Sequence, residues 1–532
     1  MNPFLRAPVS PWLYPLLGVT ILLLPFILSA QQSLFTKVFY DAQGDAQAYA
    51  SVQTPDHGFC IAGVKDYRPL AIKTDSAGNI VWAKQMGDLL GSFRALTITG
   101  DSCLLFAGEV SEEYSPVSDL FIMKTTLGGD TLWMKTFNAG AVRQNAVSVY
   151  TTSDGGYIVG GRAENDLPPY CTALILKLDP EGDLEWGQLL SISNGSTAIF
   201  SARQLGVDGF AVTGAFEEVN SGDEKMFLLR MTMDGNVVWS NTADFAWGAS
   251  CGLDVIPGSS GLTWMFSWDV TGLGLLRTSN DGTPLWCRSY GYSGYLGLLY
   301  RNAPKLSGTA EGGFVFVDGA EYGPGWGVKT DSAGHPVDRA SLFLNTIGGM
   351  ETVDGNYLFT GNGPILGVEM AGTDHQQIGL IKTDQLFSTS ACAYSEFPFS
   401  DTCEVNLTVC SVTGTPVGPG MDLHRIFSDA VLSTDSGCVA FIGAVGNIEG
   451  GEDVSMEIYP NPSDGIVNIR LIAGSGDEKI IGLEMISSTG VTVAAIPDAG
   501  CRIDVSCLPS GLYLLRAETT SGILTKRLIL QR

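Results

Sequence analysis

The chain has 532 residues, too many for one ordinary domain. Its 66 glycines, few charged residues (16%) and 45% hydrophobic content are typical of an all-β protein and exclude a disordered one. Nucleic-acid binding is disfavoured, because the net charge is −26, with 30 Lys and Arg against 56 Asp and Glu, and no basic cluster is present to neutralise phosphates.

The first predicted element is a signal peptide over residues 1–30. Arg6 is the only positive charge before an apolar run from Trp12 to Leu28, and small residues follow up to Ala30. This order is typical of a secretory signal that is cut after Ala30. The run is also long enough for a membrane anchor. Two prolines within it favour cleavage, so we expect no transmembrane segment in the mature chain.

Internal repeats organise residues 31–384. The stretch LAIKTDSAGNIVWAK, Leu70 to Lys84, recurs six times at steps of about 50 residues, twice in weaker form. Each copy has a basic residue, and five have a Trp after a Gly turn. These residues are Lys73, Trp82, Lys124, Trp133, Lys177, Trp186, Arg230, Trp239, Arg277, Trp286, Lys329 and Lys382. Because they recur, we expect a structural role: Trp packed between units, and Lys or Arg paired with loop carboxylates or carbonyls.

A second element precedes each copy and is clearest as DGGYIVGG, Asp154 to Gly161; another alternating run precedes that. Each unit therefore has four short strand signals separated by Gly and Asp turns. Runs such as ALILKL are apolar on both faces, as a strand packed between two sheets must be. Four strands per repeat at this period predict a seven-bladed β-propeller with four-stranded blades.

The seventh unit lacks a Trp strand after Lys382, and a candidate for the missing strand precedes the first unit. LFTKVFYD, Leu34 to Asp41, resembles IVWAKQMGD, with Phe35 at the Trp position and Lys37 at the position of Lys84. We expect this N-terminal strand to be the outer strand of the last blade, which closes the ring and removes an exposed edge.

The repeats resemble the secreted propeller repeats of bacterial surface proteins, in which DGGYIV-x-G and K-x-D-x-x-G-x-x-x-W alternate. The resemblance covers roughly residues 34–384 and implies a fold without specifying a function. The D-x-x-G-x-x-x-W half also resembles the tryptophan-docking repeats of pyrroloquinoline-quinone enzymes. Those propellers usually have eight blades and a fixed cofactor site that this sequence does not show, so no cofactor is predicted.

No linear motif identifies a catalytic residue. The four histidines are far apart in sequence, and no His/Cys pair has the spacing of zinc ligands. A nucleophile elbow and a P-loop are both missing. A glycosidase could still use two carboxylates from distant blades, which no linear pattern reveals. The catalytic residues therefore stay unknown at this stage.

The loops after the DGGYIVGG-like strands should emerge on one face of the ring, and in blades two to four they are acidic. Their carboxylates are Glu109, Glu112, Glu113, Asp119, Glu164, Asp166, Glu217, Glu218, Asp223 and Glu224. Two interpretations are open: a solvated rim, or a surface that attracts cations, calcium included, although no loop has EF-hand spacing. Blades five and six have aromatic residues instead, which predict either core positions or a sugar- or protein-binding patch. They are Trp264, Trp268, Tyr290, Tyr292, Tyr295, Tyr300 and Trp326.

Residues 385–452 have no recognisable fold pattern and predict a Cys-containing linker or small module. Cys392, Cys403, Cys410 and Cys438 cluster here, which favours two disulfides among them. The remaining cysteines of the repeat region flank apolar strands, and we expect them to be buried thiols. These are Cys60, Cys103, Cys171, Cys251 and Cys287.

The last predicted domain, residues 453–532, opens with MEIYPNPSDGIVNIRL and continues as short alternating strands. About seven strands in roughly 80 residues predict a small Ig-like β-sandwich. In CRIDVSC, Cys501 and Cys507 are at the ends of one strand, about 20 Å apart, so no disulfide is expected between them.

This tail resembles the type A C-terminal sorting domain of the type IX secretion system. The matching positions, in the family's order, are Tyr459, Pro460, Asn461, Pro462, Gly465, Gly490, Pro509, Gly511, Tyr513 and Lys526. The resemblance implies export through the periplasm by the type IX secretion machinery. It also implies release from, or attachment to, the outer-membrane surface of a Gram-negative bacterium.

Three hypotheses for function follow from these patterns. The first is a binding or adhesion module for an extracellular polysaccharide or protein. The second is a hydrolase or lyase that acts on an extracellular polymer with carboxylates in the propeller funnel, and the third is a structural surface-layer component. Unpaired funnel carboxylates with raised pKa would favour the enzyme, whereas an apolar filling would favour binding by the rim loops.

Overall fold

The computed structural model describes most of the repeat region and the strands that follow it. The described residues are 34–40, 44–167, 169–192, 195–217, 224–245, 250–258, 261–268, 272–292, 304–318, 325–342, 345–362, 377–385, 387, 405–410, 412–418, 421–422, 427–429, 433–435, 454–459, 466–473, 480–487, 492–497, 502–504, 511–519 and 523–530. All regular elements among them are β-strands. None of these residues belongs to a helix long and apolar enough to cross a membrane. The predicted signal peptide lies outside the described residues.

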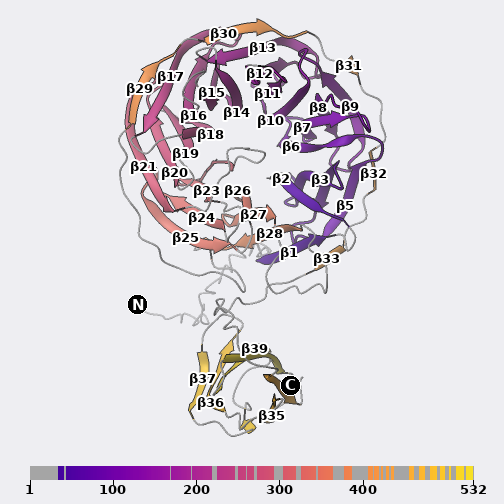
Figure 1. The fold of residues 1–532 in the computed structure, drawn as a ribbon, viewed down its shortest axis with the longest axis vertical. Coiled ribbons are helices and arrows are strands. Elements are labelled where there is room, and N and C mark those ends of the chain that lie inside the picture. Colours follow the sequence, from indigo (N-terminus) through magenta and orange to yellow (C-terminus); the bar gives the residue numbers. More distant parts are fainter. Residues whose placement is uncertain are drawn as a thin grey trace, which may run out of the picture. The chain divides into compact units, whose positions relative to one another are not determined.

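Seven antiparallel sheets follow one another around a ring, as the repeats predict (Figure 1). Blades one and two contain β2 (Ala46–Gln53), β3 (Phe59–Lys65), β4 (Arg68–Thr74), β5 (Ile80–Met86), β6 (Leu90–Ile98), β7 (Leu104–Ser111), β8 (Asp119–Thr125) and β9 (Thr131–Phe137). Blades three and four contain β10 (Arg143–Thr151), β11 (Tyr157–Glu164), β12 (Cys171–Leu178), β13 (Leu184–Ile192), β14 (Ser196–Gln204), β15 (Phe210–Glu217), β16 (Glu224–Met231) and β17 (Val237–Phe245). Blades five and six contain β18 (Ser250–Gly258), β19 (Gly261–Trp268), β20 (Gly272–Thr278), β21 (Pro284–Tyr292), β22 (Ser307–Gly308), β23 (Phe314–Asp318), β24 (Gly325–Thr330) and β25 (Pro336–Leu342). Blade seven contains β26 (Asn345–Glu351), β27 (Tyr357–Asn362), β28 (Ile378–Thr383) and β1 (Phe35–Tyr40).

The core lies between neighbouring blades. In β12, the run from Ala173 to Leu178 is buried on both faces, which explains why its sequence does not alternate. One cluster joins Leu105 and Ile122 of blade two to Val159 and Leu174 of blade three, and similar clusters fill the other junctions. Each blade therefore buries its two faces against its neighbours, and the hydrophobic core consists of these contacts between blades.

The N-terminal strand closes the ring in the predicted register. β1 pairs with β28, and Phe35 lies opposite Lys382. In blade one, Trp82 lies opposite Lys73 in the same way. Phe35 also contacts the turn at Gly78 of blade one, just as Trp133 contacts the turn at Gly182 of the next blade. The closure prediction is therefore confirmed.

After blade seven, the chain returns along the outside of the ring as a belt, defined here as residues 405–435. Its short strands are β29 (Val405–Val409), β30 (Val412–Pro416), β31 (Met421–Asp422), β32 (Phe427–Asp429) and β33 (Ser433–Asp435). They pair in turn with β17, β13, β9, β5 and β1, so the belt visits the blades in reverse order (Figure 1). No pattern in residues 405–435 predicts this arrangement.

The belt adds a fifth strand to five blades and covers edges that would otherwise present unpaired backbone groups. In blade seven the belt also pairs with the N-terminal strand. There β33 pairs with the free side of β1, so that the N-terminal strand is held between β28 and β33. The ring closure and the belt therefore stabilise the same strand.

The glycine in each repeated turn leaves room for an aromatic ring of the preceding blade. Replacing such a glycine should therefore lower stability. Gly182 has φ of +81° and a Cβ on it would lie 2.6 Å from Trp133, whereas Gly140 has φ of +80° and open space around it. We expect Gly140→Ala to cost about 1–2 kcal/mol for its left-handed backbone. Gly182→Ala should cost roughly 1–3 kcal/mol more, because the ring must move. Urea denaturation of both variants checks this, and equal losses would contradict the proposed contact.

The cysteine predictions hold for some residues and need correction for others. Cys287, expected to be a thiol, is disulfide-bonded. Cys410, expected to form a disulfide, is a free thiol, because it lies beside Ser240 on the outer edge of blade four rather than in a separate module. The other described cysteines are free, so the partner of Cys287 lies outside the described residues. Of these free thiols, Cys60 and Cys251 are buried, as expected, whereas Cys103 and Cys171 are only partly buried, which corrects the prediction for them.

The C-terminal residues form two sheets of their own. β34 (Val454–Tyr459), β35 (Ile466–Ala473) and β38 (Arg502–Asp504) form one, and β37 (Thr492–Pro497), β36 (Ile480–Ser487), β39 (Gly511–Thr519) and β40 (Ile523–Leu530) form the other. Alternate residues are buried, such as Leu483 and Met485 on β36, and β34 contacts β40. These features fit a small β-sandwich. Cys501 and Cys507 lie outside the described residues, so the absence of a bond between them stays a prediction.

Candidate functional site

The inner strands of the blades line the middle of the ring, and they share one irregularity. Six of them have a register shift at the same position in their pairing with the second strand. The extra residues are Tyr49, Arg94, Val147, Phe200, Leu253 and Ile347. A bulge leaves backbone groups unpaired and turns the strand locally. It therefore supplies free carbonyl groups at the centre.

Lys305, just before blade six, occupies that centre. Its Nζ donates to the carbonyl of Phe200 at 3.1 Å and to that of Val147 at 3.4 Å. Both acceptors are bulge residues, on blades four and three. Lys305 also forms a bridge to Gly348 of blade seven. A residue that contacts blades three, four and seven from blade six must lie in the middle of the ring.

Asp254 of blade five completes a network with Lys305. The carboxylate is fully buried and accepts from Ser201 Oγ (2.5 Å), Arg203 Nη2 (2.8 Å) and the backbone N–H of Leu306 (2.9 Å). Burial raises the pKa of Asp254, but the charges of Arg203 and Lys305 outweigh it, so that the pKa is lowered overall. This carboxylate stays ionised and paired, and it is unsuited to act as a general acid.

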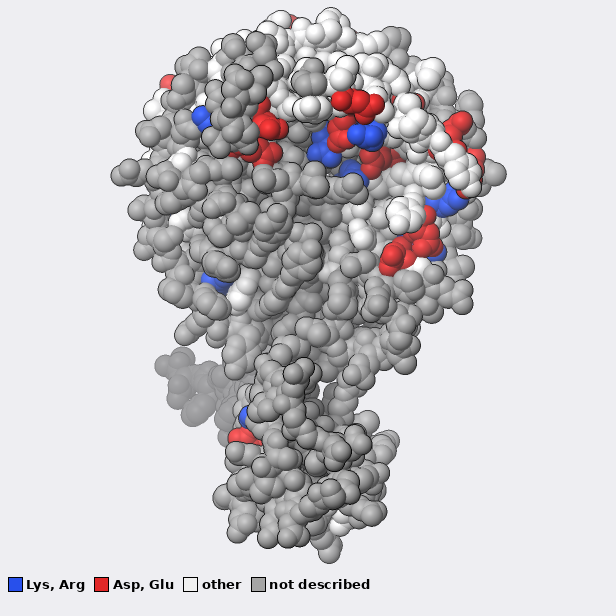
Figure 2. Space-filling view, in the orientation of Figure 1, with Lys and Arg blue, Asp and Glu red and all other residues white. Residues whose placement is uncertain are grey.

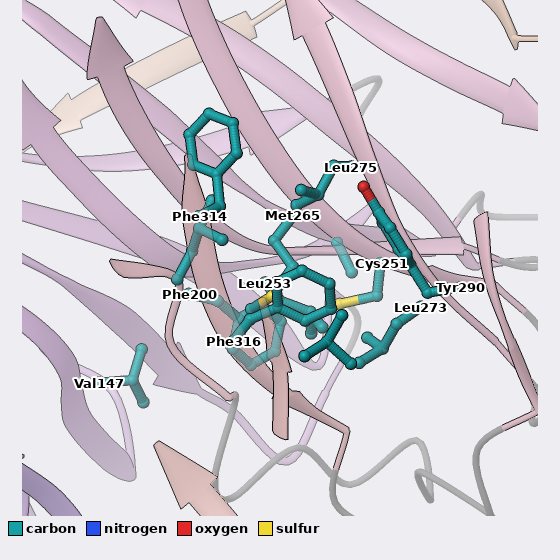
Figure 3. Close-up of a cluster of buried hydrophobic side chains, with 13 residues drawn as sticks. Val147, Phe200, Cys251, Leu253, Met265, Leu273, Leu275, Tyr290, Phe314 and Phe316 are labelled. Carbon is teal, nitrogen blue, oxygen red and sulfur yellow. The ribbon is translucent and has the colours of Figure 1, made fainter. Parts of the chain in front are cut away.

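Apolar side chains fill the space beside this network. Figure 3 shows Leu253, Cys251, Met265 and Phe316 packed closely together, all of them buried. The same cluster includes Val147 and Phe200 from the inner strands of blades three and four. Among the residues that the structure describes, this region thus combines packed apolar side chains with a paired carboxylate.

The acidic loops lie on one face of the ring, because antiparallel strands alternate and all loops from second to third strands emerge together. Figure 2 shows acidic and basic side chains next to one another on the visible face. Glu112, Glu113 and Asp166 are exposed, as a solvated rim requires. Glu218 and Asp223 lie outside the described residues. On this acidic face, some carboxylates are therefore exposed to solvent, whereas others pair with arginine, as described next.

Arginines pair with one acidic residue in each of blades two and three, Glu109 and Glu164. Arg94 donates to Glu109 at 2.8 Å and stacks over the ring of Tyr49 at 4.9 Å. Arg162 and Arg143 both pair with Glu164, at 2.9 and 3.1 Å. Burial raises the pKa of Glu109, but Arg94 outweighs this effect and the pKa is lowered. Neither carboxylate is available to bind a cation.

Blade four differs, because Glu217 and Glu224 face each other across β15 and β16 without an arginine between them. Burial, reinforced by the charge of Glu217, raises the pKa of Glu224 to about 7, although Arg162 opposes the shift. Its Oε2 is buried and has no hydrogen-bond partner among the described residues. This is the one described carboxylate on the acidic face with a clearly raised pKa.

The raised pKa of Glu224 predicts a pH dependence of stability. Between its ordinary value of 4.5 and about 7, the folded chain binds more protons at this site than the unfolded chain. Stability should therefore fall as pH rises through that window. Glu224→Gln should remove this loss and be more stable than wild type at pH 8 by about 1–3 kcal/mol. Thermal melts at pH 5 and pH 8 check this, with Glu112→Gln as an exposed control; equal behaviour of all three would contradict it.

Most of the repeated basic residues pair with a polar residue in or beside the first turn of their own blade. Lys73, Lys124 and Lys177 pair with Asp56, Asp101 and Asp154 of the first turn of their blades at 2.8–2.9 Å. Lys382 pairs with Asp354 at 2.8 Å, and Lys329 lies 3.7 Å from Glu311. Arg277 donates to Thr263, because its turn has no carboxylate. For Arg230, Nη1 has no partner among the described residues.

The tryptophans reach the following blade with both ring and N–H. Nε1 of Trp82, Trp186 and Trp239 donates to a turn carbonyl of the next blade, at 2.9–3.1 Å. Trp133 and Trp286 contact Gly182 and Gly334 there. These contacts give each of the repeated tryptophans a place in the architecture, and Trp186 also lines a hollow discussed below.

Other residues singled out in the sequence are dispersed. Trp264 and Tyr290 are buried in the core, and Trp326 lies under Arg339 at 4.1 Å. The side chains of Trp268 and Tyr292, and residues Tyr295 and Tyr300, lie outside what the structure describes. His57 and His335 are on different turns. No group of three possible metal ligands occurs in the part of the chain that the structure describes.

Of the sorting-motif positions, the structure describes four. Tyr459 is the last residue of β34 and Gly511 the first of β39. Tyr513 lies opposite Leu528 and Lys526 opposite Leu515 in the β39–β40 pair. The prolines of the motif, with Asn461, Gly465 and Gly490, lie outside the described residues.

Comparison with known proteins identifies the tail. Residues 457–531 match the family described as the secretion system C-terminal sorting domain. No curated protein matches the chain. Among solved structures, this chain is similar to a protein of unknown function from Bacteroides caccae. The identity is 11%, the match covers 57% of this chain and 93% of that one, and the TM-score is 0.29.

Two further solved structures are similar. One is PorZ, described as an essential surface component of the type IX secretion system of Porphyromonas gingivalis, with 10% identity, a TM-score of 0.15 and coverage of 93% of this chain and 100% of that one. The other is a GH43 glycoside hydrolase, with 10% identity, a TM-score of 0.20 and coverage of 67% and 83%. Likeness at this level carries no argument about function.

Proposed function

We propose that this chain is a binding protein that the type IX secretion machinery exports to the cell surface or the medium, where its propeller binds an extracellular polysaccharide or protein. In this proposal residues 1–30 are the signal peptide, 31–384 the propeller, 385–452 a connecting segment that includes the belt, and 453–532 the sorting domain. The sorting motif from Tyr459 to Lys526 is what the machinery recognises. Support for export comes from the match of residues 457–531 to the sorting-domain family.

The observation that carries the binding role is the paired network of Lys305 and Asp254 at the centre of the ring. A polymer-degrading propeller needs open space with a carboxylate able to donate a proton. Here Lys305 and the cluster around Leu253 occupy the described centre, and Asp254 is paired with Arg203. Binding surfaces must then lie on the faces or the outer side of the ring.

A hydrolase or lyase is the second candidate, and Glu224 is the observation that favours it. Its pKa of about 7 suits a general acid, and Glu217 lies opposite it on the neighbouring strand. The pair lies at the loop ends of β15 and β16, away from the centre. The two candidates therefore make different predictions for one assay.

Co-sedimentation with insoluble polysaccharides, with reducing ends counted in the same tube, tests the proposal. A binding protein sediments with a polysaccharide and releases no new reducing ends. Release that disappears in Glu224→Gln would establish the enzyme instead. A chain that neither sediments with any polysaccharide nor captures an outer-surface protein from intact cells would overturn the binding role altogether.

A further inference from the structure

A hollow of about 500 Å³ is lined by residues of β13, of the turn before β17 and of belt strand β30. Figure 1 shows β13 and β30 side by side on the outer side of blade three. Its walls include the indole of Trp186 and the side chains of Leu184, Gln188 and Asn236. The volume is in the range of small-molecule sites, about 300–1,000 Å³. The lining of this hollow includes neither Lys305 nor Asp254 of the central network, and no residue of the acidic loops.

Two of the glycines that line the hollow come from blade three and the belt, and the first is on the blade itself. Gly187 follows the repeated Trp186. At the equivalent position the other four blades with a repeated Trp have Ala83, Met134, Ser240 and Cys287. A Cβ on Gly187 would lie 2.7 Å from Leu176 and 3.0 Å from Val417. Only blade three lacks a side chain here, because the chain of the belt approaches closely: the N–H of Val417 donates to the carbonyl of Gly187 at 2.9 Å.

The second glycine is on the belt. Gly414 lies opposite Leu190 of β13. In the same register, the belt places Leu407 opposite Ala243 of blade four and Phe427 opposite Met86 of blade one. A Cβ on Gly414 would lie 2.7 Å from Oε1 of Gln188 and 3.3 Å from Leu190. At this register the belt sequence therefore has glycine at blade three, where it has leucine at blade four and phenylalanine at blade one.

The lining combines an aromatic wall with uncharged polar groups. Trp186 is held in place, since its Nε1 donates to the carbonyl of Met233 at 2.9 Å and its ring meets Phe210 edge-on. Gln188 donates to the carbonyl of Gly235, which fixes its amide at the edge of the hollow. Asn236 is exposed there, beside Trp186. Indole faces pack on apolar C–H groups, and amides bond hydroxyls, so this set of groups suits a sugar ring.

Charge narrows the ligand class. The lining has one charged residue, Glu185, and its carboxylate pairs with Lys177 at 3.0 Å. Lys177 is buried and also pairs with Asp154. No basic residue lines the hollow to receive a uronate or a sulfate. We propose that the hollow binds a neutral sugar unit of an extracellular polysaccharide; this deepens the binding role proposed above and rests on it.

The test is calorimetric titration of the full mature chain with neutral xylo-, gluco-, manno- and galacto-hexasaccharides, and with hexagalacturonate as an acidic probe. Gly414→Leu adds a large apolar side chain to the lining of the hollow. Thr415→Leu adds the same side chain on the opposite face of β30 and is the matched control. Asn236→Ala removes one polar group from the exposed turn without changing the belt.

We expect at least one neutral hexasaccharide to bind, with affinity at least tenfold weaker in Gly414→Leu, about three- to tenfold weaker in Asn236→Ala, and within twofold of wild type in Thr415→Leu. Binding that both hollow variants leave unchanged would overturn this site while leaving the proposed function intact. Preference for hexagalacturonate would overturn the neutral class. If no saccharide binds but the chain captures a surface protein, the site fails and a protein partner is favoured.

Discussion

A chain that lacks residues 34–40 is expected to lose its folded propeller and to aggregate. β1 pairs on one side with β28 and on the other with β33 of the belt. It also buries Phe35, Val38 and Phe39, each at most 7% exposed. Burial of such a side chain contributes about 1.5–3 kcal/mol, so their joint loss approaches the whole stability of a typical domain, about 5–15 kcal/mol.

Point variants separate this effect from simple shortening of the chain. Phe39→Ala should lower the free energy of unfolding by about 3–5 kcal/mol, since it leaves a large cavity between blade seven and blade one. Thr36→Val should be neutral or slightly stabilising, because the buried hydroxyl of Thr36 has no hydrogen-bond partner among the described residues. Size-exclusion chromatography and urea denaturation measure these outcomes. A monomeric deletion variant with wild-type stability would refute the closure.

Asp254→Asn is expected to destabilise the ring more than any other substitution of a single charge described above. The variant leaves Arg203 and Lys305 near the centre without their counter-charge. Removing one partner of a buried pair costs about 3–5 kcal/mol. Asp183→Asn is the matched control, because Asp183 pairs with Lys135 while its side chain is 72% exposed, and an exposed pair contributes only about 0–1 kcal/mol.

The same carboxylate predicts how acid affects the fold. The pKa of Asp254 is lowered below its ordinary 3.8, so the unfolded chain takes up a proton at higher pH than the folded chain. The contribution of Asp254 to stability is complete above about pH 4 and is lost as the pH falls further. Denaturation at pH 3 and pH 6 should therefore show a smaller gap between Asp254→Asn and wild type at pH 3. A gap of equal size at both values would contradict this assignment.

Much of the fold was readable from the sequence because its information is local and repeated. Phe35 could be aligned with the repeated tryptophans, and its position opposite Lys382 follows from that alignment. Turn glycines such as Gly182 could be recognised from their place before each Trp strand. Seven copies of one pattern predict one architecture, since each unit must bury its two faces on its neighbours.

The belt and the centre were not readable because each depends on contacts that occur once. Gly414 and Phe427 lie in short strands of two to five residues, and their sequences do not alternate. Their pairing is decided by the outer edges of a ring that already exists. Lys305 likewise meets Phe200 and Val147 only because bulges turn those carbonyls inward. The hollow at blade three could not be predicted either, because its lining comes from both the blades and the belt.

The measurement that tests the central claim most directly is fractionation of a bacterium with a type IX secretion system that expresses two forms of this protein. One form is the full chain, and the other ends after residue 453, which keeps the propeller and the belt but removes the strands from β34 onward. We expect the full chain at the cell surface or in the medium, and the truncated chain folded and protease-resistant in the periplasm. A truncated chain that still leaves the cell, or a full chain that stays in the periplasm, would contradict the account.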